Sequence, residues 1–229
     1  MRSTIFTLMT CLPLMTGITA CGSGDSEQSL AEQRAEEHQR LEEVQEEHIR
    51  RGSGLEQDSL SFEQAFALFM TAIQAADTTT LNQFIHPDQG LWMIEQPGAM
   101  PKMTRVTDIR EFKREFEGRS FFTIRDEVKT CDPLDEAWPS FDCADMNYDQ
   151  GQSGYSKDGC FVSAPAKFQK SGYWDYASLT DTDIKQVKAA LPLLQKSVLH
   201  TATSFEFHFG PVDGQWRLLF AKLIYPCSA

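Results

Sequence analysis

A histidine lies next to a carboxylate in the segment His86-Pro87-Asp88. A carboxylate beside an imidazole can tune it as a general base near neutral pH, so these residues have the groups that proton transfer requires. The alternative is a helix stop at the proline, in which the Asp88 side chain holds a turn. Both interpretations rest on the same three residues, and we prefer the turn.

A second acid/base pair, Glu206 and His208, lies in an alternating segment near the end of the chain, where Phe205, Phe207 and Phe209 occupy the positions between and beside them. Successive side chains of a strand point to opposite faces, so the polar pair shares one face and the phenylalanines share the other. If the polar face lines a cavity, the pair has catalytic potential. We expect instead that it faces solvent, because the phenylalanines take the core side.

Tyr173, Trp174 and Tyr176 form an aromatic cluster in a segment that follows a glycine. Such side chains stack on sugars or anchor peptides in binding sites, and elsewhere they pin a loop to its domain, which is the role we expect. The chain contains no Ser-His-Asp, Cys-His, glycine-rich phosphate-loop or H-E-x-x-H motif. We therefore predict no catalytic residue and no cofactor.

Oxygen-bearing side chains alternate at Asp145, Asn147 and Asp149, as in loops that bind Ca²⁺. However, the glycine falls at position seven of such a loop instead of six, and position twelve is a serine instead of a bidentate glutamate. Asp142 and Asp158 are the acidic neighbours that would have to complete the site. The alternative is a solvated acidic loop, and we predict no bound metal.

The chain has six cysteines, of which Cys11 and Cys21 lie at the N-terminus. The other four are too far apart for a zinc site built from C-x-x-C pairs, and an even number favours two disulfides in an oxidising compartment. Three connectivities are open. We expect Cys131–Cys143, which closes a short local loop, with Cys160–Cys227, which ties the chain end to the sheet.

The first twenty residues have the composition of an export signal. Arg2 precedes an uncharged run over residues 5–20 that is too short to span a bilayer comfortably. The run ends in Ile18-Thr19-Ala20-Cys21, which resembles the lipobox of bacterial lipoproteins. That resemblance implies cleavage before Cys21, lipid on its sulfur, and a partner membrane. Gly22 follows where an inner-membrane signal would have Asp, which favours the outer membrane. The alternative is an ordinary secretory signal.

The chain is acidic, with 21 basic and 33 acidic residues and a net charge of −12. Such a surface repels nucleic acid and anionic lipid head groups. Residues 25–54 are rich in Glu, Gln, Arg and Ala and poor in apolar residues, which favours a solvated helical stalk or a partly disordered one over a coiled coil. We predict a signal peptide over 1–20, a lipidated tether and stalk over 21–59, and one α+β domain over 60–229.

The apolar pattern of that domain predicts helices and strands around a polar, cysteine-flanked insertion at 131–160. Ser61 is a plausible N-cap for the first helix, whose aromatic residues share one face. Asp213-Gly214 marks the turn of a terminal hairpin. The expected helices are 62–76, 81–85, 107–116 and 181–199, and the expected strands are 90–95, 120–129, 161–168, 204–209 and 216–225.

This order, with the segment from Asp77 to Pro87 and the strand entry Asp213-Gly214-Gln215-Trp216, resembles the cone-shaped nuclear-transport-factor-2-like fold. The resemblance covers roughly residues 60–130 and 203–225. It implies a curved antiparallel sheet that wraps around the N-terminal helices. A cystatin-like helix on a sheet is the alternative.

Three classes of function follow from these patterns. We favour a membrane-anchored binding or interaction domain without catalysis, over an acid/base enzyme with a cone cavity and over an accessory lipoprotein that acts through its stalk. We also predict that the aromatic residues form the core and do not line a catalytic pocket. The expected core faces are Phe62, Phe66 and Phe69 of the first helix, Phe205, Phe207 and Phe209, and Trp216, Leu218 and Phe220.

Overall fold

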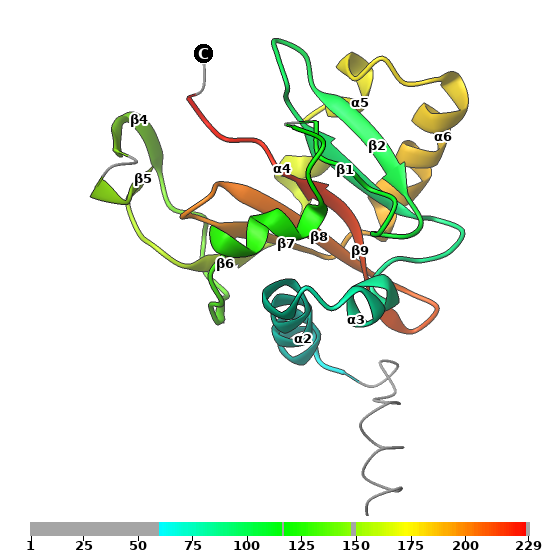
Figure 1. Ribbon diagram of the computed structural model, residues 1–229, viewed down its shortest axis with the longest axis horizontal. Coiled ribbons are helices and arrows are strands. Elements are labelled where there is room, and N and C mark those ends of the chain that lie inside the picture. Colours follow the sequence, from blue (N-terminus) through cyan, green and yellow to red (C-terminus); the bar gives the residue numbers. More distant parts are fainter. Residues whose placement is uncertain (1–59, 116, 148–149, 228–229) are drawn as a thin grey trace, which may run out of the picture. The chain divides into compact units, whose positions relative to one another are not determined.

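A curved, unclosed sheet of seven strands organises the residues that the computed structural model describes, which are 60–115, 117–147 and 150–227 (Figure 1). Its order is β2-β1-β9-β8-β7-β6-β3, and its neighbours are antiparallel except for β1 with β9 and β3 with β6. The mixed α+β class and the largely antiparallel sheet are thereby confirmed. The strands of this sheet are β1 (Leu91–Glu95), β2 (Lys102–Val106), β3 (Pro133–Leu134), β6 (Cys160–Ser163), β7 (Lys196–His200), β8 (Phe205–Val212) and β9 (Gln215–Lys222).

One face of the sheet is covered by helices α2 (Phe62–Ala75) and α3 (Thr78–Gln83) and by the 3₁₀ helix η2 (Phe121–Asp126). Ser61 caps α2 as expected: its hydroxyl accepts from the Gln64 N–H, and the Gln64 side chain accepts from the Ser61 N–H. Phe69 of α2 packs edge-on against Phe207 and Phe209 of β8. The prediction that these phenylalanines form the core is confirmed.

The opposite face of the sheet is also covered, by helices α4 (Ala166–Gln169), α5 (Tyr173–Tyr176) and α6 (Asp181–Ala190) (Figure 1). Trp174 and Phe168 are buried there against Phe220 and Leu219 of β9. His208, expected on a solvent-facing surface, is fully buried beneath this layer. That expectation was wrong because the alternation of a strand reveals its two faces but not whether a distant segment covers the second one.

A β-bulge in β9 changes which of its side chains share a face. His208 pairs with Phe220 and Phe209 pairs with Leu218, so Leu219 is an extra residue on the β9 side. Leu218 therefore packs in the α2 layer, whereas Leu219 and Phe220 both pack in the α4–α6 layer. The expectation that Trp216, Leu218 and Phe220 share one face was wrong for Phe220.

Two segments near the middle of the domain differ from expectation. Residues 107–115 form turns instead of a helix, and the Asn82 side chain holds them by pairing with the Asp108 carboxylate and the Ile109 N–H, both at 2.9 Å. Residues 120–129 contain η2 instead of a strand. Phe121, Ile124 and Val128 are buried there, and their spacing fits a helical turn better than an alternating strand.

The helix expected over 181–199 ends earlier, at Ala190. A short 3₁₀ helix, η4 (Leu191–Leu193), contains Pro192, after which Leu194 is extended and β7 begins. Proline removes a backbone hydrogen-bond donor from the helix. The residues that follow it instead form backbone hydrogen bonds with β6 on one side and β8 on the other. Likewise, the strand expected over 161–168 ends at Ser163, and Phe168 belongs to α4.

The middle of the insertion at 131–160 forms a separate two-stranded hairpin, β4 (Phe141–Asn147) and β5 (Gln152–Tyr155), beyond the main sheet (Figure 1). Gly154 is required there because its φ is +79° and a Cβ would lie 2.8 Å from the Asp142 carbonyl oxygen. Within the described residues, no helix has the length and apolar character to cross a bilayer. The signal, Cys21, the stalk, Phe116 and Asp149 lie outside the described residues.

Candidate ligand cavity

A cavity of about 440 Å³ opens between the β4–β5 hairpin, helices α4 and α5, and the strands β8 and β9. We call it the aromatic cavity, because four aromatic side chains line it together with three charged ones. Ligand sites in proteins commonly have volumes of about 300–1,000 Å³, so the space suits a small molecule. The residues that define it are Trp138, Phe141, Tyr155, Tyr173, Lys167, Glu206 and Lys222.

A buried ion pair lies in this cavity. Glu206 of β8 and Lys222 of β9 are paired across the two strands, and Lys222 Nζ is 2.5 Å from Glu206 Oε1. Their side chains are only 12% and 16% exposed. Burial lowers the pKa of Lys222, but the Glu206 carboxylate and the Tyr173 hydroxyl outweigh it, so the pKa is raised and the ammonium stays charged.

The aromatic walls come from parts of the chain that are distant in sequence. Phe141 and Tyr155 pack against each other across the hairpin, with 4.7 Å between ring centroids. The ring centroid of Tyr173 lies 5.6 Å from Lys222 Nζ. Burial raises the pKa of the Tyr155 hydroxyl, which is therefore neutral at physiological pH. Of the predicted aromatic cluster only Tyr173 reaches the cavity, since Trp174 is core and Tyr176 is exposed.

Next to Glu206, the polar side chains of His208 and Ser197 are also buried. His208 Nδ1 lies 2.7 Å from Ser197 Oγ, and Nε2 lies 3.5 Å from Glu206 Oε2. Burial and then the Lys222 charge hold the pKa of His208 well below its ordinary value, so its ring is neutral. Ser197 and His208 are 1% and 0% exposed, which leaves the serine hydroxyl no path to a substrate. Ser197 and His208 therefore form a buried structural pair, and His208 Nε2 makes no hydrogen bond to Glu206.

Two disulfides join the four cysteines, as predicted, but their pairing is different. The bonds are Cys131–Cys160 and Cys143–Cys227, where we expected Cys131–Cys143 and Cys160–Cys227. The expectation chose the shortest local loop, whereas the structure places Cys131 beside β6 and Cys143 beside the C-terminal segment. As a result, one bond closes the base of the 131–160 insertion and the other fastens its hairpin to the chain end.

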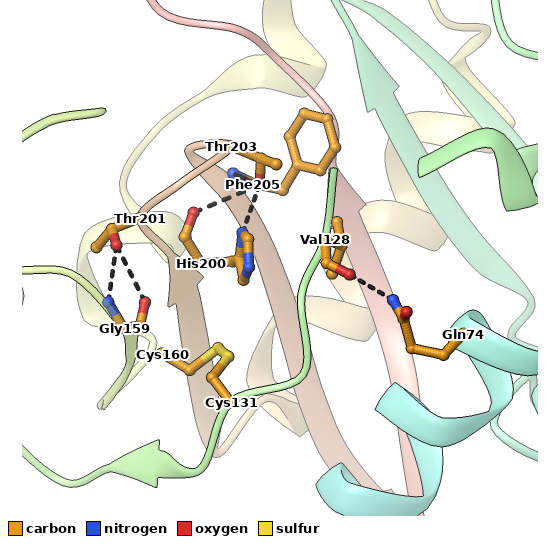
Figure 2. Close-up of a disulfide and its surroundings, with 9 residues drawn as sticks. All are labelled: Gln74, Val128, Cys131, Gly159, Cys160, His200, Thr201, Thr203 and Phe205. Atoms are coloured by element: carbon orange, nitrogen blue, oxygen red, sulfur yellow. Dashed lines mark hydrogen bonds between the residues drawn. A yellow bond between two sulfur atoms is a disulfide. The ribbon is translucent and has the colours of Figure 1, made fainter. Parts of the chain in front are cut away.

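The buried disulfide has a histidine beside it (Figure 2). The two sulfurs of Cys131–Cys160 and one ring nitrogen of His200 lie within 4.8 Å of one another, the donor types that zinc prefers. As a disulfide, however, the sulfurs have no thiolate charge to offer a cation, and His200 Nδ1 lies 2.8 Å from Thr203 Oγ1. The group is a packed disulfide, close to the point where Gln74 of α2 donates to the Val128 carbonyl at 2.5 Å.

His86 holds a turn, as we preferred, although its side chain takes the role expected of Asp88. The His86 Nδ1 accepts the backbone N–H groups of Asp88 and Gln89, both at 3.1 Å, so the ring proton is on Nε2. Nε2 donates to the Asp213 carboxylate at 3.0 Å, in the turn between β8 and β9. The pair therefore fastens the hairpin to the α3–β1 connection and has both ring nitrogens engaged.

The acidic residues of the insertion do not converge on one point within the described part of the chain. The Asp142 carboxylate accepts the Ala144 N–H, the Asn147 amide oxygen accepts the Gln150 N–H, and Asp158 pairs with Ser153. These three side chains thus hydrogen-bond within the insertion, and the absence of a bound metal stays a prediction.

A second cavity, of about 350 Å³, lies beside Glu95, Arg114 and Tyr225. Its charged groups already pair with protein partners: Arg114 Nε is 3.3 Å from Glu95 Oε1, and Tyr225 donates to Glu127 at 2.8–2.9 Å. We therefore take the aromatic cavity, in which Lys167 is not matched by a carboxylate, as the candidate site. No family model, curated protein or solved structure matches this chain, so function is argued from the geometry.

Proposed function

We propose that this chain is a lipid-anchored protein of the cell envelope whose folded domain binds a small ligand in the aromatic cavity without catalysing a reaction. The observation that carries this proposal is the Glu206–Lys222 pair, which is held largely buried in a cavity with aromatic walls. A buried ion pair adds little to stability compared with apolar residues of the same volume. Its place in a ligand-sized space favours a role in recognition.

The alternative, an acid/base enzyme, has weaker support. His208 lies 3.5 Å from the cavity residue Glu206, yet it is fully buried and its ring is neutral. A general base must come within about 3 Å of the proton that it removes. The Phe168 ring covers one face of this imidazole, and Ser197 occupies its Nδ1. A substrate in the cavity would meet Glu206 and Lys222 first.

The proposed address rests on the N-terminal sequence and on the disulfides. Lipidation of Cys21 would anchor the chain to a membrane, and Gly22 after it favours the outer one. Two disulfides suit an exported protein, because cytosolic thiols are kept reduced. The net charge of −12 supports a partner that is not a nucleic acid. Residues 25–54 would act as the stalk.

We also propose that the domain has the nuclear-transport-factor-2-like cone architecture. Support comes from the curved sheet with α2 and α3 on one face and from the terminal β8–β9 hairpin at its centre. Phe62, Phe66 and Phe69 would then fill the cone interior, so the candidate cavity would lie on the outer face of the cone.

Ligand-induced thermal stabilisation tests the binding proposal. The mature chain would be melted with neutral hexoses, hexuronates, amino acids, dipeptides, fatty acids and nucleotides. We expect one class to raise the Tm by mass action on the folded state. The rise should vanish in Tyr155→Ala, which removes a wall of the cavity, and persist in Tyr176→Ala, an exposed tyrosine outside it. No shift with any class, or a shift that survives Tyr155→Ala, would contradict the proposal.

Mass spectrometry tests the anchor separately. Membrane-extracted protein from a lipoprotein-competent host should begin at an acylated Cys21, and Cys21→Ser should release the protein from the membrane fraction. Deletion of residues 25–54 is the matched test of the accessory alternative. If cells that carry the deletion behave like cells without the protein, although the shortened chain still binds its ligand, the stalk carries the function.

A further inference from the structure

The charge inside the aromatic cavity is not balanced. The charged side chains that line it are Glu206 and Lys222, which are largely buried, and Lys167, which is exposed to solvent; they are two ammonium groups against one carboxylate. Glu206 is committed to Lys222 at 2.5 Å. Among the described residues no carboxylate lies within ion-pair distance of Lys167, whose ammonium is 5.3 Å from the Trp138 ring centroid. On a chain with a net charge of −12, this cavity therefore favours an anion.

The polar groups around the cavity indicate a ligand rich in hydroxyls. Ser140 and Ser204 line it together with the hydroxyls of Tyr155 and Tyr173, which both donate and accept hydrogen bonds. Glu206 adds carboxylate oxygens, which only accept and therefore match hydroxyl donors on a ligand. These groups already contact one another, Tyr155 with Ser204 and both Glu206 and Tyr173 with Lys222, so a ligand with hydroxyls can join their hydrogen bonds. A purely apolar acid, such as a fatty acid, has no hydroxyl with which to do so.

The aromatic rings supply the remaining element. Trp138 and Phe141 line the cavity from the insertion, while Tyr173 lines it from α5. Aromatic faces pack against the C–H face of a pyranose ring and leave its hydroxyl groups free at the edges. A matching ligand therefore has a flat apolar face for the aromatic rings, hydroxyl groups for the polar residues and a negative charge for Lys167.

We infer that the aromatic cavity binds a pyranose sugar that carries one carboxylate, a uronic acid residue, with its ring against the aromatic walls and its carboxylate on Lys167. This assignment rests on the proposed binding function. Lys222 and Glu206 then form hydrogen bonds with the sugar hydroxyls. Lys167 pairs with the carboxylate and so favours uronic acids over neutral sugars.

The test compares sugars that differ only in the carboxylate. Ligand-observed NMR titrations of the folded mature chain would use D-galacturonate and D-glucuronate against D-galactose and D-glucose. We expect at least one uronate to bind about tenfold more tightly than its neutral counterpart, because it gains a charge-assisted contact. Lys167→Gln should remove that preference and leave the melting temperature unchanged. Lys170→Gln, a nearby exposed lysine that does not line the cavity, is the matched control and should keep it.

The outcomes separate the two proposals. Equal binding of acid and neutral sugar, or a preference that survives Lys167→Gln, overturns the assignment of a uronic acid and leaves a binding cavity standing. The same holds if only another class of ligand stabilises the chain and Tyr155→Ala abolishes that effect. If no class binds, both proposals fail.

Discussion

The imidazole of His208 stacks on the phenyl ring of Phe168, with 3.7 Å between ring centroids and 23° between their planes. Phe168 belongs to α4, forty residues before His208 in the chain, and it brings the second helical layer onto the sheet. The contact explains why a polar residue in an alternating strand is fully buried.

Replacement of His208 by alanine should therefore destabilise the domain. The change removes a buried ring and its contact with Ser197, and we expect a loss of about 2–4 kcal/mol in the free energy of unfolding. Phe207→Ala, on the opposite face of the same strand, should cost about 3–5 kcal/mol. Tyr176→Ala, which is 61% exposed, is the control and should stay within about 0.5 kcal/mol. Urea unfolding measures all three, and a wild-type midpoint for His208→Ala would show that the α4 layer does not cover this face.

Stability should fall as the pH drops below about 6.5. Burial lowers the pKa of both His208 and His200 in the folded state, so the unfolded chain binds more protons below its own histidine pKa. The stability is complete above the unfolded pKa and declines from there toward the folded pKa values. Each histidine contributes a slope of up to about 1.4 kcal/mol per pH unit.

Unfolding free energies between pH 8 and pH 5 measure this slope. His200→Asn should lose part of it, since one titrating group is removed. A constant free energy over this range would mean that both histidines bind protons in the folded state as readily as in the unfolded chain; for His208 the Glu206 carboxylate, 3.5 Å away, would then be the counter-ion.

Non-reducing peptide mapping should find Cys131 joined to Cys160 and Cys143 joined to Cys227. The bonds span 29 and 84 residues, and a loop-entropy argument gives each about 3.5–4.5 kcal/mol. Cys143→Ser with Cys227→Ser should also raise hydrogen exchange in the β4–β5 hairpin, because that bond fastens it to the chain end. The Cys131→Ser, Cys160→Ser pair is the comparison, and unchanged exchange in both would show that the hairpin is held by other contacts.

Arg114 and Glu95 should behave as a buried ion pair. Their side chains are 4% and 9% exposed, and the Arg114 guanidinium also lies 5.8 Å from the Tyr225 ring centroid. Arg114→Met alone leaves a buried carboxylate without its partner and should cost about 3–5 kcal/mol. The double variant with Glu95→Met should recover most of that loss. Additive losses in a double-mutant cycle would show that the two charges do not interact.

Features that a few neighbouring residues encode could be predicted from the sequence alone. The Ser61 cap, the Asp213-Gly214 turn and the phenylalanine face of β8 all follow from local hydrogen bonds, from positive φ angles and from the two-residue period of a strand. The presence of disulfides followed in the same way from the number of cysteines.

What covers each face of the sheet, and which distant residues meet, could be seen only in the folded chain. The α4–α6 layer buried His208, an extra residue at Leu219 moved Phe220 to the other face, and the insertion brought Trp138 and Tyr155 to a cavity that Lys222 lines. Such outcomes depend on contacts between segments tens of residues apart. The free energy of such a contact depends on both segments together, so neither segment's sequence reveals it alone. For the same reason, cysteine spacing did not determine which sulfurs join.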